Sequence, residues 1–301
     1  MPELPEVETI RRGLDKYVVG HRILDVDIKA PRIFSGDKEN VIGAKIVSVR
    51  RLGKGLILNL DNNYSLAIHI KMTGQLIYRG KETEDIEISK TKVGSVPNKF
   101  THVIFELDGS PSAGSGSSDS KNPTTKLYYN DQRRFGWIKV VPTKDVMDLT
   151  FFKTVGPEPP ISPDSHEHEL TLEMFKKVLN GKPTKIKPLI MDQARIGGIG
   201  NIYANDALFK ARIDPRRPAK SLTDKEIEML YKSVIDVMKL SLEKGGASEL
   251  SYVNVLGNEG SYQRYSLVYG EKGKPCKNCG TKIEFEKLGG RGTFYCPKCQ
   301  K

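Results

Sequence analysis

The sequence predicts an α+β protein of several domains: a β-sandwich that begins with a helix, then a helical domain, then a C-terminal zinc ribbon with four cysteine ligands. Two observations support this prediction. Apolar residues follow the two-residue period of strands in the first half of the 301-residue chain and a helical period in the second half. All four cysteines lie near the C-terminus, in two Cys-x-x-Cys pairs.

The chain opens MPELPEVETI, with a proline after the first methionine and acids close behind it. Proline is tolerated in a first helical turn, and carboxylates interact favourably with the N-terminal end of a helix dipole. These features predict a helix over about residues 5–18. Its apolar stripe consists of Leu14, Tyr17 and Val18.

Residues 21–142 show the alternation of antiparallel strands. Leu66 and Ile68, for example, alternate with Ala67 and His69, and turns such as DNN and DGS separate the apolar runs. We therefore expect a mostly antiparallel sandwich or flattened barrel, with the first domain covering residues 1–150.

Two segments interrupt the strand pattern. The stretch 109–125 is rich in serine and glycine, and the stretch 81–99 is polar, so both are expected to be flexible surface loops without chemistry of their own. The proline-dense sequence TVGPEPPISPD then predicts a hinge over residues 151–164.

Helical signals dominate the next domain, expected over residues 165–272. Thr171 can cap one helix that Gly181 ends, and Thr223 with Glu226 forms a capping box ahead of a longer helix. The apolar positions of these two helices are Leu172, Phe175, Val178, Leu179, Ile227, Leu230, Val234 and Met238.

Between those helices, ARIGGIGNIYANDALF combines a glycine turn with a helix start. Gly197, Gly198 and Gly200 allow a tight turn and the close approach of a ligand, and Asn201 then begins a helix. Free N–H groups at a helix start can hold a phosphate. A plain turn between two helices is the alternative.

The cysteines have the spacing of a zinc site. Two short turns can each point two thiolates at one ion, with sixteen residues between the pairs. Two disulfides are the disfavoured alternative, because the chain shows no secretion signal. A zinc with four protein ligands is structural, and it would fold a ribbon over residues 273–301 with KIEFEK and GTFYC as strands. The expected ligands are Cys276, Cys279, Cys296 and Cys299.

The charge of the chain favours a polyanionic partner. Lys and Arg total 48 against 37 Asp and Glu, which gives a net charge of +11 and a pI of about 9.3. Ribosomal and membrane-surface proteins share this balance, so composition alone does not decide. The sequence has no apolar run long enough for a membrane span, and we expect a cytoplasmic, nucleoid-associated protein.

Seven motifs, met in order along the chain, resemble those of bacterial formamidopyrimidine-DNA glycosylases of the purine-lesion branch: MPELPEVETIRRGL, MTG, RRFG, GPEP, IKPLIMDQ, GIGNIYAN and TFYCPKCQK. The resemblance runs from end to end and is broken mainly by the two interrupting segments. It implies a helix–two-turn–helix domain after the hinge and damaged double-stranded DNA in the cleft between the halves. We further expect one structural Zn²⁺, no small-molecule cofactor, no membrane and a monomer.

Catalysis is expected at the N-terminus. If Met1 is removed, Pro2 carries a secondary amine, and such amines titrate near pH 7.7–8.0 in model compounds, so Pro2 can act as a nucleophile. The resemblance implies that Pro2 attacks C1′ of the damaged nucleotide with Glu3 as acid/base. It also assigns Lys54 to β-elimination and Arg291 to δ-elimination and phosphate binding. Glu6 is expected to be a structural acid that orients the helix start.

The resemblance also implies a DNA-contacting set: His69, Lys71, Met72, Arg133, Phe135 and Asn201. Met72, Arg133 and Phe135 match the residues that fill the space left by a flipped base, although without the family Met72 and Phe135 would be read as core residues. The segment 247–266 corresponds to the loop that closes over that base. Phe100 and Pro183 depart from usual DNA-contact positions, so we expect phosphate contacts there to be redistributed.

Three functions remain open at this stage. The first is a bifunctional DNA glycosylase/AP lyase of base excision repair that excises 8-oxoguanine and formamidopyrimidines. An alternative form of this function is a glycosylase that prefers oxidised pyrimidines. The second is a catalytically silent protein that binds damaged DNA. The third is a zinc-ribbon adaptor that binds other proteins.

Overall fold

The computed structural model describes residues 1–109, 125–162 and 168–301, and the chain forms two compact units. The first unit comprises Met1–Pro2, Glu6–Lys153 and Gly245–Ser261. The second comprises Glu3–Pro5, Thr154–Lys244 and Tyr262–Lys301. Most of the predicted 109–125 loop, and the end of the predicted hinge, lie outside the described residues.

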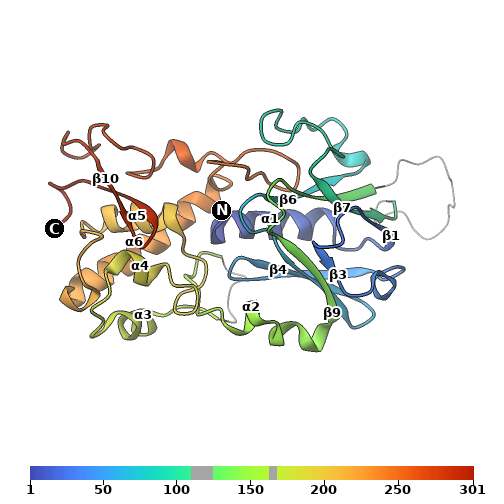
Figure 1. Ribbon diagram of the computed structural model, residues 1–301, viewed down its shortest axis with the longest axis horizontal. Helices are drawn as coiled ribbons and strands as arrows, with labels where there is room; N and C mark the ends of the chain where they lie inside the picture. Colours follow the sequence, from blue (N-terminus) through green and yellow to red (C-terminus); the bar gives the residue numbers. More distant parts are fainter. Residues whose placement is uncertain (110–124, 163–167) are drawn as a thin grey trace. The chain divides into compact units, whose positions relative to one another are not determined.

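The first unit is a β-sandwich (Figure 1). One sheet has the order β1-β7-β8-β6 and the other β2-β9-β5-β4-β3. Neighbouring strands are antiparallel except for β2 and β9, which are parallel. The elements are α1 (Leu4–Tyr17), β1 (Ile23–Ile28), β2 (Phe34–Ser35), η1 (Lys38–Asn40), β3 (Ile46–Leu52), β4 (Gly55–Leu60), β5 (Tyr64–His69), β6 (Gly74–Arg79), η2 (Lys81–Thr83), β7 (Thr101–Leu107), β8 (Thr125–Asp131), β9 (Trp137–Pro142), η3 (Thr143–Asp148) and α2 (Thr150–Lys153).

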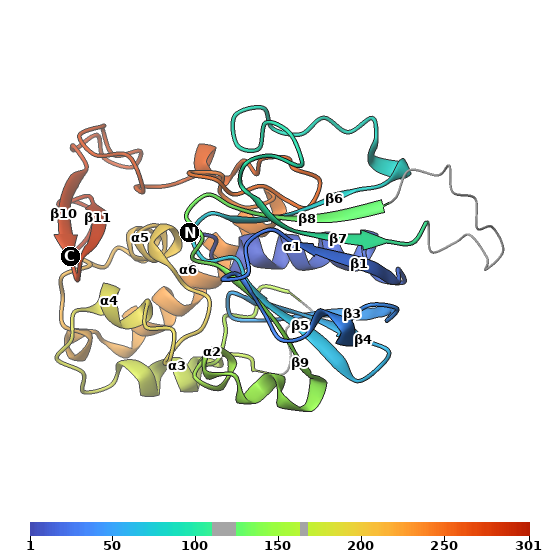
Figure 2. The same cartoon turned by 45° about the vertical axis from the view of Figure 1, so that its right-hand side comes forward.

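Helix α1 shares one apolar core with both sheets. Its residues Val7, Ile10 and Leu14 are spaced three and four apart, so they lie on one face of the helix, and all three are buried in this core. Figure 2 shows α1 running between the two sheets. The predicted helix and the predicted sandwich are therefore confirmed.

Both faces of the five-stranded sheet are covered. Ala67 and His69 alternate with the core residues Leu66 and Ile68, yet they are buried too. The reason is helix α2, whose Phe151 ring lies edge-on to the His69 ring with the centroids 4.5 Å apart. Alternation therefore identified the strand, but it did not show which of its faces water reaches.

The second unit contains helices and a two-stranded ribbon. Its helical elements are α3 (Leu172–Leu179), α4 (Ile186–Ile190), α5 (Asn201–Lys210), η4 (Ala219–Ser221), α6 (Asp224–Glu243) and η5 (Tyr262–Arg264). Thr171 caps α3 by accepting a hydrogen bond from Met174 N, and Thr223 and Glu226 form the predicted capping box of α6. In the described parts of the chain, no helix combines the length and apolar character that crossing a membrane requires.

Candidate functional site

The zinc ribbon consists of β10 (Glu284–Leu288) and β11 (Arg291–Tyr295), flanked by the two cysteine pairs. The four Sγ atoms all lie within 4.8 Å of one another, with Cys276 3.9 Å from Cys299 and Cys279 3.5 Å from Cys296. A tetrahedral ion with Zn–S bonds of about 2.3 Å separates its sulfur ligands by about 3.8 Å. The four cysteines thus fit one structural Zn²⁺.

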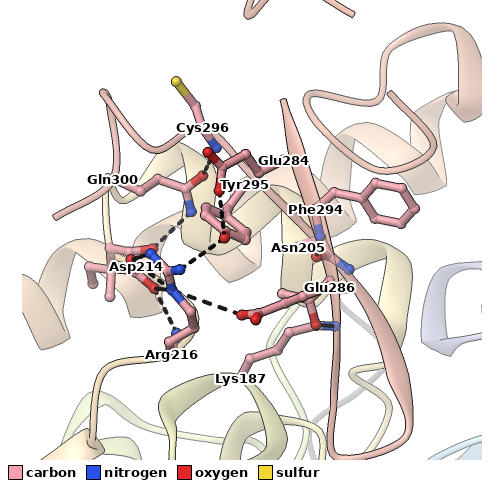
Figure 3. Close-up of polar contacts among 12 residues, drawn as sticks. Lys187, Asn205, Asp214, Arg216, Glu284, Glu286, Phe294, Tyr295, Cys296 and Gln300 are labelled. Carbon is pink, nitrogen blue, oxygen red and sulfur yellow. Dashed lines mark hydrogen bonds and ion pairs between the residues drawn. The ribbon is translucent and has the colours of Figure 1, made fainter. Parts of the chain in front are cut away.

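Polar contacts attach the ribbon to the helical part of its unit (Figure 3). Asn205 on α5 accepts a hydrogen bond from Phe294 N through Oδ1 at 2.8 Å. Arg216 donates to the Tyr295 hydroxyl at 2.9 Å. Gln300 receives the Cys296 N–H at 2.8 Å, and its amide donates to the carbonyl of Ile213. The hairpin is therefore held through β11 and at its metal-binding end.

Lys187 on α4 is the central cation of this unit, although the sequence analysis missed it. Its side chain is 1% exposed, and its ammonium donates to Asn201 Oδ1 at 2.7 Å, to the Gly292 carbonyl at 2.8 Å and to Thr293 Oγ1 at 2.9 Å. Burial lowers the pKa of Lys187 to about 7; the Arg291 charge acts in the same direction and Glu3 opposes it. A lysine among the apolar residues of a short helix was the available sequence signal.

Glu3 lies at the N-terminus of α5. Its Oε1 accepts a hydrogen bond from Ile202 N at 2.9 Å, and Leu4 N donates to the Gly198 carbonyl at 3.1 Å. A Cβ on Gly200 would collide with the Glu3 carboxyl group. The predicted anion-binding turn therefore receives a carboxylate of the chain itself, and the Ile202 N–H is used by Glu3 instead of a phosphate.

Three predicted site residues are brought together in this unit by Lys187. Asn201 contacts its ammonium directly, and both Glu3 and Arg291 lie near enough to change its pKa. Arg291 is exposed at the start of β11, directly after two glycines with φ of 58° and 75° that make the hairpin turn. The result is a cluster of one acid and two cations at the α5 N-terminus and the ribbon tip.

In the first unit, Lys54 and His69 are both 4% exposed. Burial lowers the pKa of His69 to about 3, and the charges of Lys71 and Lys54 act in the same direction, so the imidazole is neutral. Its Nδ1 accepts the Lys71 N–H at 2.9 Å. This bond holds the turn after β5, where Lys71 has a φ of 47°, and so His69 shapes the turn that presents Met72. A direct DNA contact by His69 stays a prediction.

Met72, Arg133 and Phe135 lie close together on two turns of the first unit. Arg133 donates to the Met72 sulfur at 3.1 Å, and its guanidinium lies 4.8 Å from the centroid of the Phe135 ring. Phe135 is 53% exposed, so it is not a core residue. Buried Asp131, which the sequence analysis missed, accepts hydrogen bonds from Thr73 and from the backbone N–H groups of Arg133 and Gly136. It holds both turns in place.

Glu6 connects α1 to the segment Gly245–Ser261. Its Oε1 accepts the Ala247 N–H at 2.8 Å, and it is 1% exposed. A Cβ on Gly246 would press on the same carboxylate. The acid expected to orient the helix start thus contacts the beginning of the predicted 247–266 loop.

Comparison with known proteins covers the chain in three parts. Residues 1–138 match the formamidopyrimidine-DNA glycosylase N-terminal domain, residues 161–251 match the formamidopyrimidine-DNA glycosylase H2TH domain, and residues 273–301 match a zinc finger found in FPG and IleRS. These matches agree with the fold class: an N-terminal α+β domain, an H2TH domain and a Cys₄ zinc finger.

Full-length relatives agree with these domain matches. A formamidopyrimidine-DNA glycosylase of Pelotomaculum thermopropionicum is 39% identical over 306 residues, spanning 100% of this chain and 99% of that protein. A Lactococcus lactis FPG mutant in complex with Fapy-dG-containing DNA is 29% identical, with a TM-score of 0.82 and 100% of both chains covered. A MutM structure with DNA containing carbocyclic 8-oxo-G is 30% identical, with a TM-score of 0.81 and the same coverage.

Proposed function

Because the chain belongs to the formamidopyrimidine-DNA glycosylase family, we propose that it excises oxidised purines from double-stranded DNA and then cleaves the strand through Pro2. The single observation that carries the proposal for this chain is the pairing of a proline at position 2 with a buried carboxylate at position 3, 3% exposed and fixed at the α5 N-terminus.

The first step is nucleophilic substitution. With Met1 removed, the Pro2 nitrogen attacks C1′ of the damaged nucleotide, the bond from C1′ to the base breaks, and the base leaves with a proton. Glu3 donates a proton to the sugar ring oxygen, which opens the ring. The product is an iminium ion between Pro2 and the sugar. The single N–H proton of the Pro2 amine is lost when the bond to C1′ forms and leaves with the base. The iminium nitrogen then carries no hydrogen, so it cannot become a neutral imine and stays charged.

The second step uses that charge. The iminium acidifies C2′, so a base can remove its proton and the 3′ phosphate leaves; a second elimination releases the 5′ phosphate. Lys54 is assigned to the first proton transfer and Arg291 to the second elimination. Support for Arg291 comes from its exposure on the hairpin turn and its charge interaction with Lys187, which itself contacts Asn201.

A base can react only after it leaves the duplex, and the space it leaves must be filled. Met72, Arg133 and Phe135 suit this role because they combine an apolar side chain, a cation and an exposed ring on turns held by Asp131. The guanidinium would address the orphaned cytosine, and the two apolar side chains would occupy the stack.

Borohydride trapping tests the proposal. Reduction should link the wild-type protein covalently to duplex DNA that carries 8-oxoguanine opposite cytosine. Pro2→Gly should trap more slowly and bind DNA as well as wild type. A protein with an uncleaved extension ahead of Pro2 has no free amine, so it should bind without trapping. Wild-type binding without any adduct would contradict the enzyme and favour a silent damage-binding protein.

A second duplex, which carries an oxidised pyrimidine in place of 8-oxoguanine, tests the alternative that the enzyme prefers oxidised pyrimidines. Faster excision of that base than of 8-oxoguanine would contradict the proposed preference for oxidised purines.

Mass spectrometry of the purified N-terminus checks the premise of the mechanism, since retained Met1 blocks the amine. Mutation of the cysteines should remove the zinc and, with it, the salt-sensitive DNA binding. If the wild-type protein shows no such DNA binding, the alternative of a zinc-ribbon adaptor for proteins is favoured.

We propose that the protein acts as a monomer on chromosomal DNA in the cytoplasm. Its net charge of +11 suits a nucleoid-associated protein. Light scattering coupled to size exclusion, at the concentration used for trapping, should give a mass near 33.6 kDa.

A further inference from the structure

The segment 81–99, expected from sequence to be a mobile polar loop, is fastened to the first unit. Its Val93 and Val96 pack against a small apolar cluster that contains Ile77, Ile104, Tyr128 and Val253. Ser89 N donates to the Gly257 carbonyl at 2.8 Å. In Figure 2 this segment is the teal loop beside the orange segment Gly245–Ser261. The contacts hold residues 81–99 against both the outer face of a sheet and that segment.

Two side chains fasten the middle of 81–99 in particular. Buried Gln75 on β6 donates one amide hydrogen to the Lys92 carbonyl at 3.1 Å and the other to the Ser251 carbonyl at 2.6 Å. Glu259 accepts hydrogen bonds from the hydroxyls of Ser89, at 2.6 Å, and Thr91, at 3.0 Å. Lys92 itself and two residues that precede it are thereby bound to two other parts of the unit.

Lys92 also lines a pocket of about 470 Å³ together with Met72, Thr91, Arg133, Glu249 and Leu250. Its side chain is half-buried, and among the described residues it has no ion pair within 4.0 Å. The hydrogen bond from Ser89 and, more weakly, the charge of Lys92 lower the pKa of Glu259, so these two charges act on each other. The Lys92 backbone is fixed on both sides, since Lys92 N donates to Ser89 Oγ at 3.1 Å. The fold therefore places two cations, Lys92 and Arg133, and one acid, Glu249, around the same pocket, and the two cations favour an anion that binds beside them.

We propose that Lys92 is a further DNA-phosphate contact of this chain, positioned by Glu259 so that it acts beside Met72 and Arg133. The inference rests on the proposed function, which brings a polyanion to those two residues. A lysine ammonium binds a phosphate as a point charge, so the contact needs a fixed backbone more than a fixed rotamer. Segment 81–99 then belongs to the DNA-binding surface.

Paired charge variants test the contact. Lys92→Gln should weaken binding to the 8-oxoguanine duplex by up to about fivefold. It should also reduce the slope of log Kd against log salt concentration by about 0.9, which is the contribution of one phosphate contact. The control is Lys90→Gln. Lys90 lies two residues before Lys92, and its exposed side chain is not part of the pocket lining, so this variant removes the same charge outside the pocket. It should leave the slope unchanged. Equal slopes for the two variants would overturn the inference.

Variants of Glu259 test the positioning role. Glu259→Ala removes the acceptor for Ser89 and Thr91, and so it should reproduce the reduced salt slope of Lys92→Gln even though it removes a negative charge. Glu259→Gln keeps an acceptor oxygen and should restore most of the slope. The double variant Lys92→Gln/Glu259→Ala should bind no more weakly than Lys92→Gln. Additive losses would contradict positioning through Lys92.

Failure of this inference is separable from failure of the proposed function. Trapping reports on Pro2, whereas the salt slope reports on phosphate contacts. Wild-type protein that traps, with Lys92→Gln indistinguishable from Lys90→Gln, would overturn the Lys92 contact alone. Wild-type protein that shows the Lys92-dependent slope but no trapping would overturn the enzyme and leave the contact standing. Unchanged thermal melting of Lys92→Gln would confirm that folding is intact.

Discussion

A missing methyl group at Gly200 makes room for Glu3. The backbone there has φ −131° and ψ −159°, which alanine adopts without strain, and the three atoms nearest to an added Cβ all belong to the Glu3 side chain. We expect Gly200→Ala to displace that carboxylate and to slow trapping about as much as Glu3→Gln. Trapping rates of the two single variants check this.

A double variant isolates the cause. In Glu3→Ala the carboxyl group that obstructs position 200 is absent, so adding Gly200→Ala should change neither trapping nor melting temperature further. If Gly200→Ala is as harmful in the Glu3→Ala background as in wild type, the glycine serves the backbone turn and not the acid.

Lys187 makes stability depend on pH. Its pKa is about 7 in the folded protein and about 10.4 in an unfolded chain, so the unfolded state binds more protons between these values. The free energy of unfolding should therefore rise across this window, by about 1 kcal/mol per pH unit from this group. In Lys187→Met that rise should be absent, as measured by urea unfolding at pH 7, 8 and 9. Lys185→Met, at an exposed position, should keep it.

Helix α6 begins with an acid that does more than complete a capping box. Glu226 accepts the N–H of the N-cap residue Thr223 and also pairs with Arg217, and the Arg217 hydrogen bond lowers the pKa of Glu226 to about 2, with Thr223 acting in the same direction. Its folded pKa is below the unfolded value of about 4.3, so its stabilisation is present above pH 4.3 and is lost as pH falls toward 2.

Replacing Glu226 should expose this dependence. Glu226→Gln should cost about 1–2 kcal/mol at pH 7, after allowance for solvent screening, and the difference from wild type should shrink between pH 4.3 and pH 3. Glu243→Gln, near the other end of α6, is the matched control. Urea unfolding across this pH range measures both. A deficit that stays constant down to pH 3 would argue that packing, and not the carboxylate, is responsible.

Elements with local signals could be predicted from the sequence, and contacts between distant segments could not. The α6 capping box depends on residues three apart, and the four cysteines occur as two close pairs. Lys187, by contrast, meets partners 105 and 106 positions away, and Gln75 meets Ser251 at a separation of 176. Nothing in the local pattern around 81–99 indicates that Gln75 and Glu259 will hold it.

At the scale of the whole molecule, each compact unit has its own means of stabilisation. The first has the sandwich core, which includes residues of α1 and both sheets. The second relies on the ribbon, because two of the three acceptors of the Lys187 ammonium, Gly292 O and Thr293 Oγ1, lie on it. If the ribbon unfolds, this buried cation keeps one of those three acceptors, Asn201 Oδ1, and loses the other two, which is strongly unfavourable.

Zinc removal should therefore act on one unit only. A chelator strong enough to extract the ion should unfold the hairpin, because four cysteines on so short a ribbon replace a core, and α4 and α5 should loosen as the partners of Lys187 and Asn205 leave. Hydrogen exchange read by mass spectrometry should show lost protection in residues 186–210 and 273–301. Peptides from β4 and β5, in the first unit, should keep theirs. Equal loss of protection in both units would mean that the sandwich core needs the ribbon, and restored protection after adding Zn²⁺ would exclude irreversible damage.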